Sequence, residues 1–296
     1  MWIPVTLAAA TFQILRTSRQ HQLRPTLSTN AAGLVRYLYA APLAVLASVV
    51  SFVVVGRDVP SAPGRFWLII AAGGLAQILA TVALLRSFQL RDFAIGTVYS
   101  KTEVIQVAII ATILLGEPLR PLGWAGAVVC MTGVALLAGG GTLTPLLRRA
   151  ADPAALMGVA AGGLFGAAAV AIRAASNSLT DAPAFERSLF TLTVMLTIQA
   201  VANGLQLGVS DRREFVTTLR EWRRCLPVGM LSLLGSTAWA LALTLENAAK
   251  VRTLGQVELL IAFAISHRRL GEHHTARDLA ASALVGAGVA LVALVG

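Results

Sequence analysis

Ten long apolar stretches dominate this sequence and restrict its fold more than any other feature. Each stretch approaches the ~20 residues that an α-helix needs to cross a bilayer. We expect them near residues 2–18, 31–55, 66–86, 93–115, 122–139, 155–175, 185–209, 226–245, 248–266 and 277–296. Their residues do not alternate between apolar and polar, as the strands of a membrane β-barrel would. The sequence therefore predicts an all-α integral membrane protein with ten transmembrane helices.

Composition excludes the main soluble alternatives. Hydrophobic residues make up 56% of the 296 residues and charged residues only 13%, about half the charged share of a soluble domain. The net charge of +10 lies in short arginine clusters between the apolar stretches, as the positive-inside rule describes. We therefore expect a lipid bilayer around the protein and no nucleic-acid partner. Two isolated cysteines and scattered histidines match no metal motif, and we expect no metal and no cofactor.

An internal repeat divides the chain into two copies. Residues of the first half recur 155 positions later: Glu103, Gly116-Glu117 and Gly133 to Leu136 match Glu258, Gly271-Glu272 and Gly288 to Leu291, and Gly74 matches Gly229. We expect a first five-helix copy over 1–141, a linker over 142–153 and a second copy over 154–296. Because five is odd, the second copy enters the membrane from the opposite side. Such inverted five-helix repeats are a common design of secondary transporters.

Three sequence features together resemble those of a known family. They are the Gly-Glu pair after the fourth helix of each copy, the Arg36-Tyr37 pair early in the second helix, and the Gly-Val-Ala-Leu stretch in each last helix. Their order and spacing resemble the EamA family of the drug/metabolite transporter superfamily. The resemblance implies a ten-helix bundle with a central pathway between its halves, and transport of small metabolites or drugs. Arg86-Ser87 departs from the aromatic-rich end that is usual for the third helix.

The leading functional hypothesis is a secondary active transporter that moves a small-molecule solute by alternating access. An amino acid or an organic cation is the favoured solute, and protons are a candidate coupling ion. No nucleotide-binding GxxxxGK[ST] motif is present in the sequence, so the energy must come from a gradient or from the solute itself. The alternatives are a non-enzymatic scaffold or subunit and a lipid-modifying membrane enzyme. We expect no enzymatic activity, and either a monomer or a homodimer.

The arginine distribution predicts an orientation in the cytoplasmic (inner) membrane. Loops on the side of the N-terminus carry six basic residues, with Arg173, Lys250 and Arg252 counted among them, and loops on the other side carry fifteen. The positive-inside rule then places the other side in the cytoplasm and both termini outside it. The family resemblance implies both termini inside, so two orientations remain open.

Glu103 and Glu258 are the sharpest candidates for a solute or proton site. They occupy equivalent positions about ten residues into their helices, which is about 15 Å at the helical rise and near the midplane. Inverted repeats place such positions beside the pseudo-two-fold axis, where substrates bind. Removal from water disfavours the charged form of a lone carboxyl group, so a proton and a cationic solute would compete for it. The structural alternative is a buried ion pair that fixes helix packing.

Other polar side chains in the predicted helices complete the candidate site. Tyr99 and Gln106 share the Glu103 face at helical spacing, and Lys101 either meets an acid on another helix or extends toward the cytoplasmic surface. Arg36 suits a carboxylate group or reaches the interface. Gln77 and Trp239 lie in equivalent helices and either line a cavity or join helices by hydrogen bonds.

Glycines and histidines have structural interpretations. Gly162 and Gly166 are spaced for close packing of the sixth helix. Gly116 and Gly271 are expected to end their helices, with Glu117 and Glu272 then at the start of the next one. We expect His267, His273 and His274 to be solvated loop residues.

Overall fold

The computed structural model describes the chain except residues 24, 91–92, 139–150, 266–274 and 296. The described part is helical. The first copy contains α1 (Trp2–His21), α2 (Thr29–Leu38), α3 (Ala40–Val49), the π-helical η1 (Val50–Val54), α4 (Gly64–Leu90), α5 (Phe93–Ser100), α6 (Glu103–Leu115) and α7 (Pro121–Ala138). The second copy contains α9 (Pro153–Asn177), α10 (Ala184–Ser210), α11 (Arg212–Arg220), α12 (Trp222–Leu245), α13 (Ala248–Leu254), α14 (Val257–Ile265) and α15 (Ala276–Val295).

These helices confirm the membrane fold. Within the described ranges, seven helical segments are long and apolar enough to cross a bilayer, and α7 is a shorter apolar helix. The two remaining predicted stretches correspond to α1 and to the pair α13 and α14. The chain is therefore an all-α membrane protein whose predicted spans all fall on helices, with five spans in each copy. The predicted linker over 142–153 lies mostly outside the described residues.

The helices gather into two compact units, each built from both copies. Unit 1 comprises Met1–Gly74 and Ile172–Leu245, and unit 2 comprises Leu75–Ala171 and Glu246–Gly296. The first two spans of the first copy thus pack with α10 and α12 of the second copy. The compact units do not follow the repeat boundary in the sequence, because helices of one copy pack directly against helices of the other.

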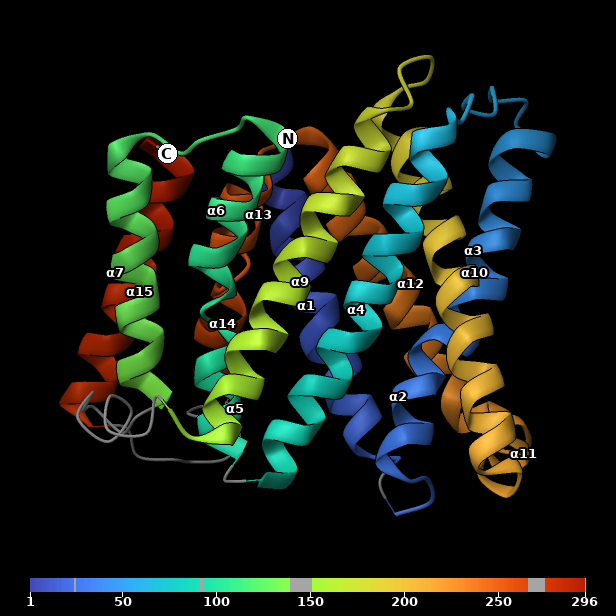
Figure 1. Ribbon diagram of the computed structural model, residues 1–296, viewed down its shortest axis with the longest axis horizontal. Helices are drawn as coiled ribbons and strands as arrows, with labels where there is room; N and C mark the ends of the chain where they lie inside the picture. The colour runs from blue at the N-terminus through green and yellow to red at the C-terminus, as the bar shows by residue number, and fades with distance from the viewer. Residues whose placement is uncertain (24, 91–92, 139–150, 266–274, 296) are drawn as a thin grey trace. The chain divides into compact units, whose positions relative to one another are not determined.

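The packing of α7 on α15 within unit 2 shows the inversion of the two copies. A Cβ atom on Gly126 would lie 3.0 Å from the carbonyl oxygen of Gly288, and one on Gly133 would lie 2.6 Å from the backbone nitrogen of Val285. The earlier residue of α7 thus faces the later residue of α15, so the two helices are antiparallel, as the ribbon also shows (Figure 1). Since α7 and α15 are equivalent in the repeat, the second copy is inverted relative to the first, as predicted.

The fourth helix of each copy is broken, which corrects the prediction of continuous helices over 93–115 and 248–266. The first break lies at Lys101 and Thr102, and the second at Gly255 and Gln256. At both breaks, amides bond to carbonyls three residues back, for example Val104 to Lys101 at 3.2 Å and Glu258 to Gly255 at 3.1 Å. In the first, the Thr102 hydroxyl also donates to the Tyr99 carbonyl at 2.6 Å, the group that would accept the Glu103 amide in a continuous α-helix.

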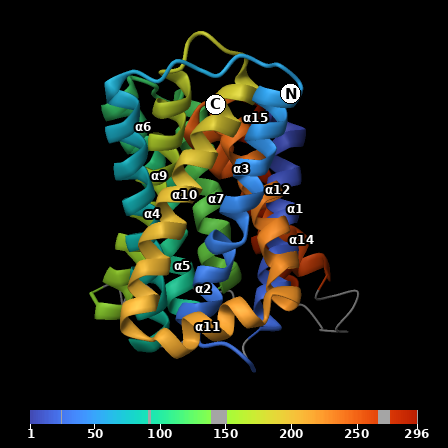
Figure 2. The same ribbon diagram turned by 90° about the vertical axis from the view of Figure 1, so that its right-hand side faces the viewer.

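Two further segments differ from the sequence expectation. The stretch over 31–55 is divided at Tyr39 and ends in the π-helical turn η1. The charged segment over 211–224, predicted as a connection, contains the short helix α11 and the start of α12. The Asp211 side chain caps the first turn of α11 by accepting the Glu214 amide at 3.0 Å. In unit 1, α11 lies across the ends of its neighbours (Figure 2) and packs on α2, α10 and α12.

Candidate functional site: two ion pairs at the helix breaks

The two candidate glutamates lie directly after the helix breaks of unit 2. Glu103 is the first residue of α6, and Glu258 is the second residue of α14. The predicted continuity is therefore corrected: a tight turn precedes each glutamate, although Val98–Leu115 still forms one apolar segment long enough to cross a bilayer. Each carboxylate lies in the first turn of the helix that follows, where the helix dipole favours negative charge. Discontinuous helices of this kind form the solute and ion sites of many transporters.

Each glutamate forms an ion pair with a basic residue from the other copy. The Arg252 guanidinium of α13 contacts the Glu103 carboxylate, and the Lys101 ammonium contacts the Glu258 carboxylate. Neither glutamate is a lone carboxyl group, so the structure contains the buried ion pairs of the structural alternative. Of the two alternatives for Lys101, the structure shows the contact with an acid on another helix.

The two pairs differ in exposure, and the difference separates their possible roles. The Glu103 side chain is 5% exposed and that of Arg252 is 20% exposed. In the second pair, Lys101 and Glu258 are 16% and 15% exposed. The difference lies in the carboxylates: Glu103 is closed off, although its partner Arg252 is the most exposed of the four side chains, whereas Glu258 keeps accessible surface.

Arg252 is the charged partner that the sequence interpretation missed. The orientation argument counts it with Lys250 among loop residues, but both lie in α13, where Lys250 pairs with Glu246 at 3.8 Å. Arg173 is counted in the same way, and it lies in α9 with its guanidinium donating to the Leu243 carbonyl at 2.7 Å. The sequence did contain a signal for this partner, because Arg252 falls inside the predicted ninth span and not in a loop.

Glycines of α9 hold the first break in place. A Cβ atom on Gly162 would lie 2.6 Å from the Ser100 carbonyl oxygen and 3.0 Å from the Glu103 amide nitrogen. One on Gly166 would lie 3.3 Å from the backbone nitrogen of Val107. The close packing predicted for Gly162 and Gly166 is confirmed, and it brings the α9 backbone against the start of α6.

Tyr99 and Gln106 both contact α9, Tyr99 through its Cβ atom and Gln106 through its side-chain amide. The Tyr99 Cβ atom lies 2.7 Å from where a Cβ on Gly158 would be. The Gln106 amide donates to the Thr102 hydroxyl at 2.8 Å and to the Val159 carbonyl at 3.2 Å. The two polar residues therefore support the break. Gln77 lies half-buried in α4, and its backbone carbonyl accepts a hydrogen bond from the Thr81 hydroxyl at 2.9 Å.

The far end of α6 joins the start of α13. Gly116 has a φ of 66° and ends α6 in the left-handed conformation, as predicted. Glu117 does not begin the next helix, because α7 starts only at Pro121. Its carbonyl instead accepts the side-chain amide of Asn247 at 3.0 Å, and Asn247 caps α13 through Ala249 at 2.8 Å. Gly271, Glu272 and the three neighbouring histidines lie outside the described residues.

Two predicted site residues belong to unit 1. The Arg36 guanidinium lies 4.8 Å from the centre of the Tyr37 ring. The Trp239 indole donates to the Gln13 side chain at 3.1 Å and so joins α12 to α1. This hydrogen bond fits the helix-joining alternative for Trp239. In the described residues, no group of three or more potential metal ligands is present.

An inverted all-helical membrane fold with ion pairs at discontinuous helices is typical of the class of membrane transporters. The model of the EamA-like transporter family matches residues 2–139 and 152–294. The chain therefore belongs to the EamA-like transporter family, with one family domain in each copy. It is a multi-pass membrane transporter of a small-molecule solute and not an enzyme.

Two individual comparisons agree with this assignment. A Sinorhizobium protein described as an uncharacterized transporter in the cobO 3′ region is 33% identical over 96 residues, which is 32% of this chain and 68% of that protein. A solved structure described as "Crystal structure of protein" superposes with a TM-score of 0.75, covering 99% of this chain and 97% of the other at 15% identity. That likeness shows a shared fold.

Proposed function

We propose that the protein is a secondary active transporter in which the Lys101–Glu258 pair is the solute-binding site. The observation that carries the proposal is the cross-copy ion pair at a helix break whose two side chains both remain partly exposed. A solute that reaches this pair finds one positive and one negative group side by side. Intramembrane charges of this kind commonly mark substrate and ion pathways.

An amino acid suits this site better than a simple organic cation. Its ammonium group would bind Glu258 while its carboxylate binds Lys101, so each charge lost from the internal pair is replaced by one from the solute. A simple cation would occupy Glu258 and leave Lys101 without its counter-charge, and an unpaired buried charge is costly. We therefore favour a zwitterionic amino acid as the solute.

Proton coupling is the second part of the proposal. Protonation of Glu258 would remove the attraction that holds Lys101 and would open the pair. A proton and the solute ammonium group would thus compete for one carboxylate. Alternating access by the two inverted copies would expose that carboxylate to each side of the membrane in turn.

The Glu103–Arg252 pair has a different proposed role. Its carboxylate is almost fully enclosed, so it would keep its partner through the transport cycle. It would hold the α6 start against α13 while the neighbouring pair opens and closes. Solute exchange and structural support would therefore belong to two different ion pairs.

We also propose the orientation that the arginine distribution indicates, in the cytoplasmic membrane with both termini outside the cytoplasm. Arg173 and Arg252 lie in helices, and so do the described arginines counted on the opposite side. On the opposite side, α11 and the start of α12 present Arg212, Arg213, Arg220, Arg223 and Arg224 as exposed residues. These exposed positive charges support the proposed orientation.

Counterflow in proteoliposomes tests the proposed solute class. Vesicles containing the purified protein are loaded with one unlabelled amino acid and diluted into the labelled form, across a panel of zwitterionic, cationic and anionic solutes. We expect accumulation of a zwitterion in wild-type vesicles and none in vesicles with Glu258→Gln. Accumulation of simple organic cations alone would contradict the amino-acid proposal.

A further inference from the structure

Unit 1 contains a membrane-level cavity that the proposed transport site does not use. It has a volume of about 720 Å³ and lies between α1, η1, α10 and α12. Its lining is mostly aliphatic, and several lining side chains are open to the surroundings: Val50 is 44% exposed, Leu234 46% and Phe185 47%. An open apolar cavity of this size in a membrane protein is accessible to hydrocarbon.

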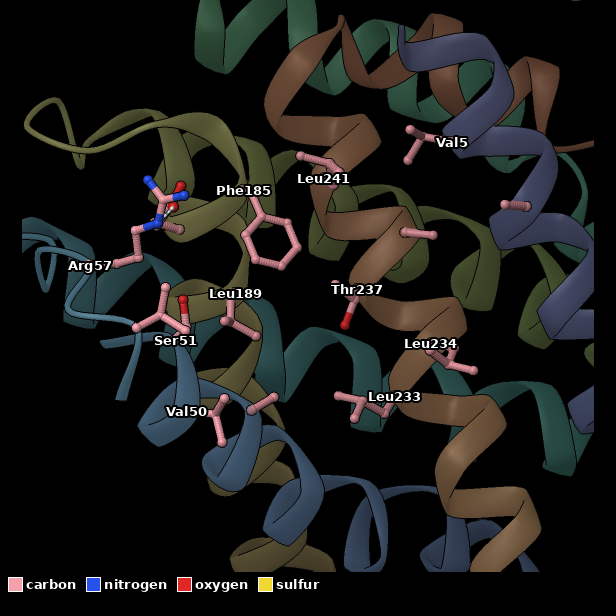
Figure 3. A pocket seen from close by; sticks show the side chains of 15 residues that line it. Val5, Val50, Ser51, Arg57, Phe185, Leu189, Leu233, Leu234, Thr237 and Leu241 are labelled. Atoms are coloured by element: carbon pink, nitrogen blue, oxygen red, sulfur yellow. Dashed lines mark ion pairs between the residues drawn. The ribbon is translucent and has the colours of Figure 1, made fainter. Parts of the chain in front are cut away.

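The cavity has one polar end. Arg57 and Glu186 form an ion pair there, with 3.7 Å between Nε and Oε1 (Figure 3). Leu233 and Leu234 lie at the opposite end. The polar end lies near the membrane surface, because Trp67 is 48% exposed and contacts Phe190 with ring centres 6.4 Å apart, one turn along α10 from Glu186. Exposed tryptophans mark that level in membrane proteins.

The depth of the cavity corresponds to one leaflet. Its lining on α12 runs from Leu233 to Leu241, which is about 12 Å at the helical rise of 1.5 Å per residue. The hydrocarbon core of a bilayer is about 30 Å thick. The cavity therefore ends before the midplane and suits a hydrocarbon chain that enters from one membrane surface.

The charges at the polar end suit an anionic head group. The Glu186 side chain is 8% exposed and already neutralised by Arg57, whereas the Arg57 side chain is 59% exposed. The ion pair uses Nε, so the two terminal nitrogens of the guanidinium stay accessible. A guanidinium fork binds the oxygens of a phosphate group well, and Glu186 orients it.

We propose that this cavity is a phospholipid site, in which the phosphate binds Arg57 and one acyl chain lies along η1 and α12. The π-helical turn η1 forms part of the wall that receives the chain, since Val50 and Ser51 line the cavity. The site is separate from the Lys101–Glu258 pair, which belongs to unit 2.

Native mass spectrometry of the full-length protein tests the proposal. Detergent-purified protein is incubated with dioleoylphosphatidylglycerol or with dioleoylglycerol, which lacks the phosphate, and retained lipid is counted. We expect one retained phospholipid on the wild type and about tenfold less retention of it by Arg57→Gln, as for the loss of a charge-assisted hydrogen bond. The wild type should retain dioleoylglycerol no better than Arg57→Gln retains dioleoylphosphatidylglycerol, because both combinations lack the phosphate–guanidinium contact.

Two further variants separate the head-group contact from the acyl-chain contact. Ala238→Phe places a ring in the cavity and should reduce retention with Arg57 intact, and Ala47→Leu serves the same purpose if Ala238→Phe does not fold. Arg65→Gln is the matched control, because Arg65 is an exposed arginine at the same end that does not line the cavity. Equal retention by Arg57→Gln and Arg65→Gln would overturn the proposal. Preferential retention of a long-chain ammonium compound that depends on Glu186 would also overturn it.

Discussion

The carboxylate of Glu103 is paired with the guanidinium of Arg252, a residue of the other sequence copy. Two residues earlier, Lys101 pairs with Glu258. The fourth helices of the two copies are therefore joined reciprocally, since each supplies one acid and one base. Both contacts cross from one inverted copy to the other at the points where the helices are broken.

Loss of the enclosed carboxylate should affect stability first. Glu103→Gln leaves the Arg252 guanidinium without its counter-charge, and removal of one partner from a buried pair costs about 3 kcal/mol. We expect a clear decrease in the free energy of unfolding, measured by denaturant titration in detergent. Glu214→Gln, at an exposed hydrogen bond with Ser28 in unit 1, is the control and should change stability little. An unchanged unfolding curve for Glu103→Gln would mean that the pair does not stabilise the fold.

Loss of the exposed carboxylate should affect transport first. Glu258→Gln removes the group that binds the solute ammonium and the proton, so counterflow should fall at least tenfold and lose its dependence on pH. The double variant Lys101→Glu with Glu258→Lys restores an ion pair in reversed order and should recover stability. Full, pH-dependent transport by Glu258→Gln would rule out its proposed role.

The α9 glycine at the first break should be intolerant of a methyl group. A Cβ atom at Gly162 would meet backbone atoms of Ser100 and Glu103 within 3.0 Å, and backbone cannot move as a flexible side chain can. Gly162→Ala should displace the break and reduce counterflow several-fold. Gly286→Ala in α15 is the matched control, because its Cβ would meet only the Leu260 side chain at 3.9 Å. Equal activity of the two variants would contradict this account.

The contact between α7 and α15 should be a main source of stability in unit 2. Gly133→Leu would force a side chain against the Val285 nitrogen and the Ala281 oxygen, and overpacking typically costs about 1–3 kcal/mol. We expect a lower thermal midpoint in detergent. Gly208→Leu in α10, where no atom lies within 4 Å of the Cβ position, should leave the midpoint near that of the wild type. A similar loss in both variants would show that the close contact between α7 and α15 is not its cause.

A reporter at the C-terminus decides between the two orientations. The arginine asymmetry predicts that a fused alkaline phosphatase, which is active only outside the cytoplasm, gives high activity, and that a fused fluorescent protein, which folds only in the cytoplasm, stays dark. The opposite result would support the orientation implied by the family resemblance. If the arginine asymmetry sets the orientation, a variant in which Arg212, Arg213 and Arg220 are all replaced by glutamine should show a weaker preference for a C-terminus outside the cytoplasm. Basic residues near helix ends determine orientation in this way.

The class of fold and its symmetry follow from the amino-acid sequence alone. Apolar length locates helices in a bilayer because every buried backbone group must bond within its own helix. Identical residues at a constant offset reveal the two copies, and an odd number of spans inverts the second. The choice of Glu103 and Glu258 as candidate site residues followed from the cost of charge in hydrocarbon. The close packing at Gly162 and Gly166 followed from their spacing.

Only folding shows which groups these residues meet. The first helix break involves a local competition for the Tyr99 carbonyl and the α9 backbone at Gly162, which spacing along one helix does not show. Arg252 lies far from Glu103 in the sequence, so only the packing of α13 on α6 could identify it as the partner. Apolar periodicity reports which residues avoid water, but partner choice among buried charges is set by the distances that folding creates.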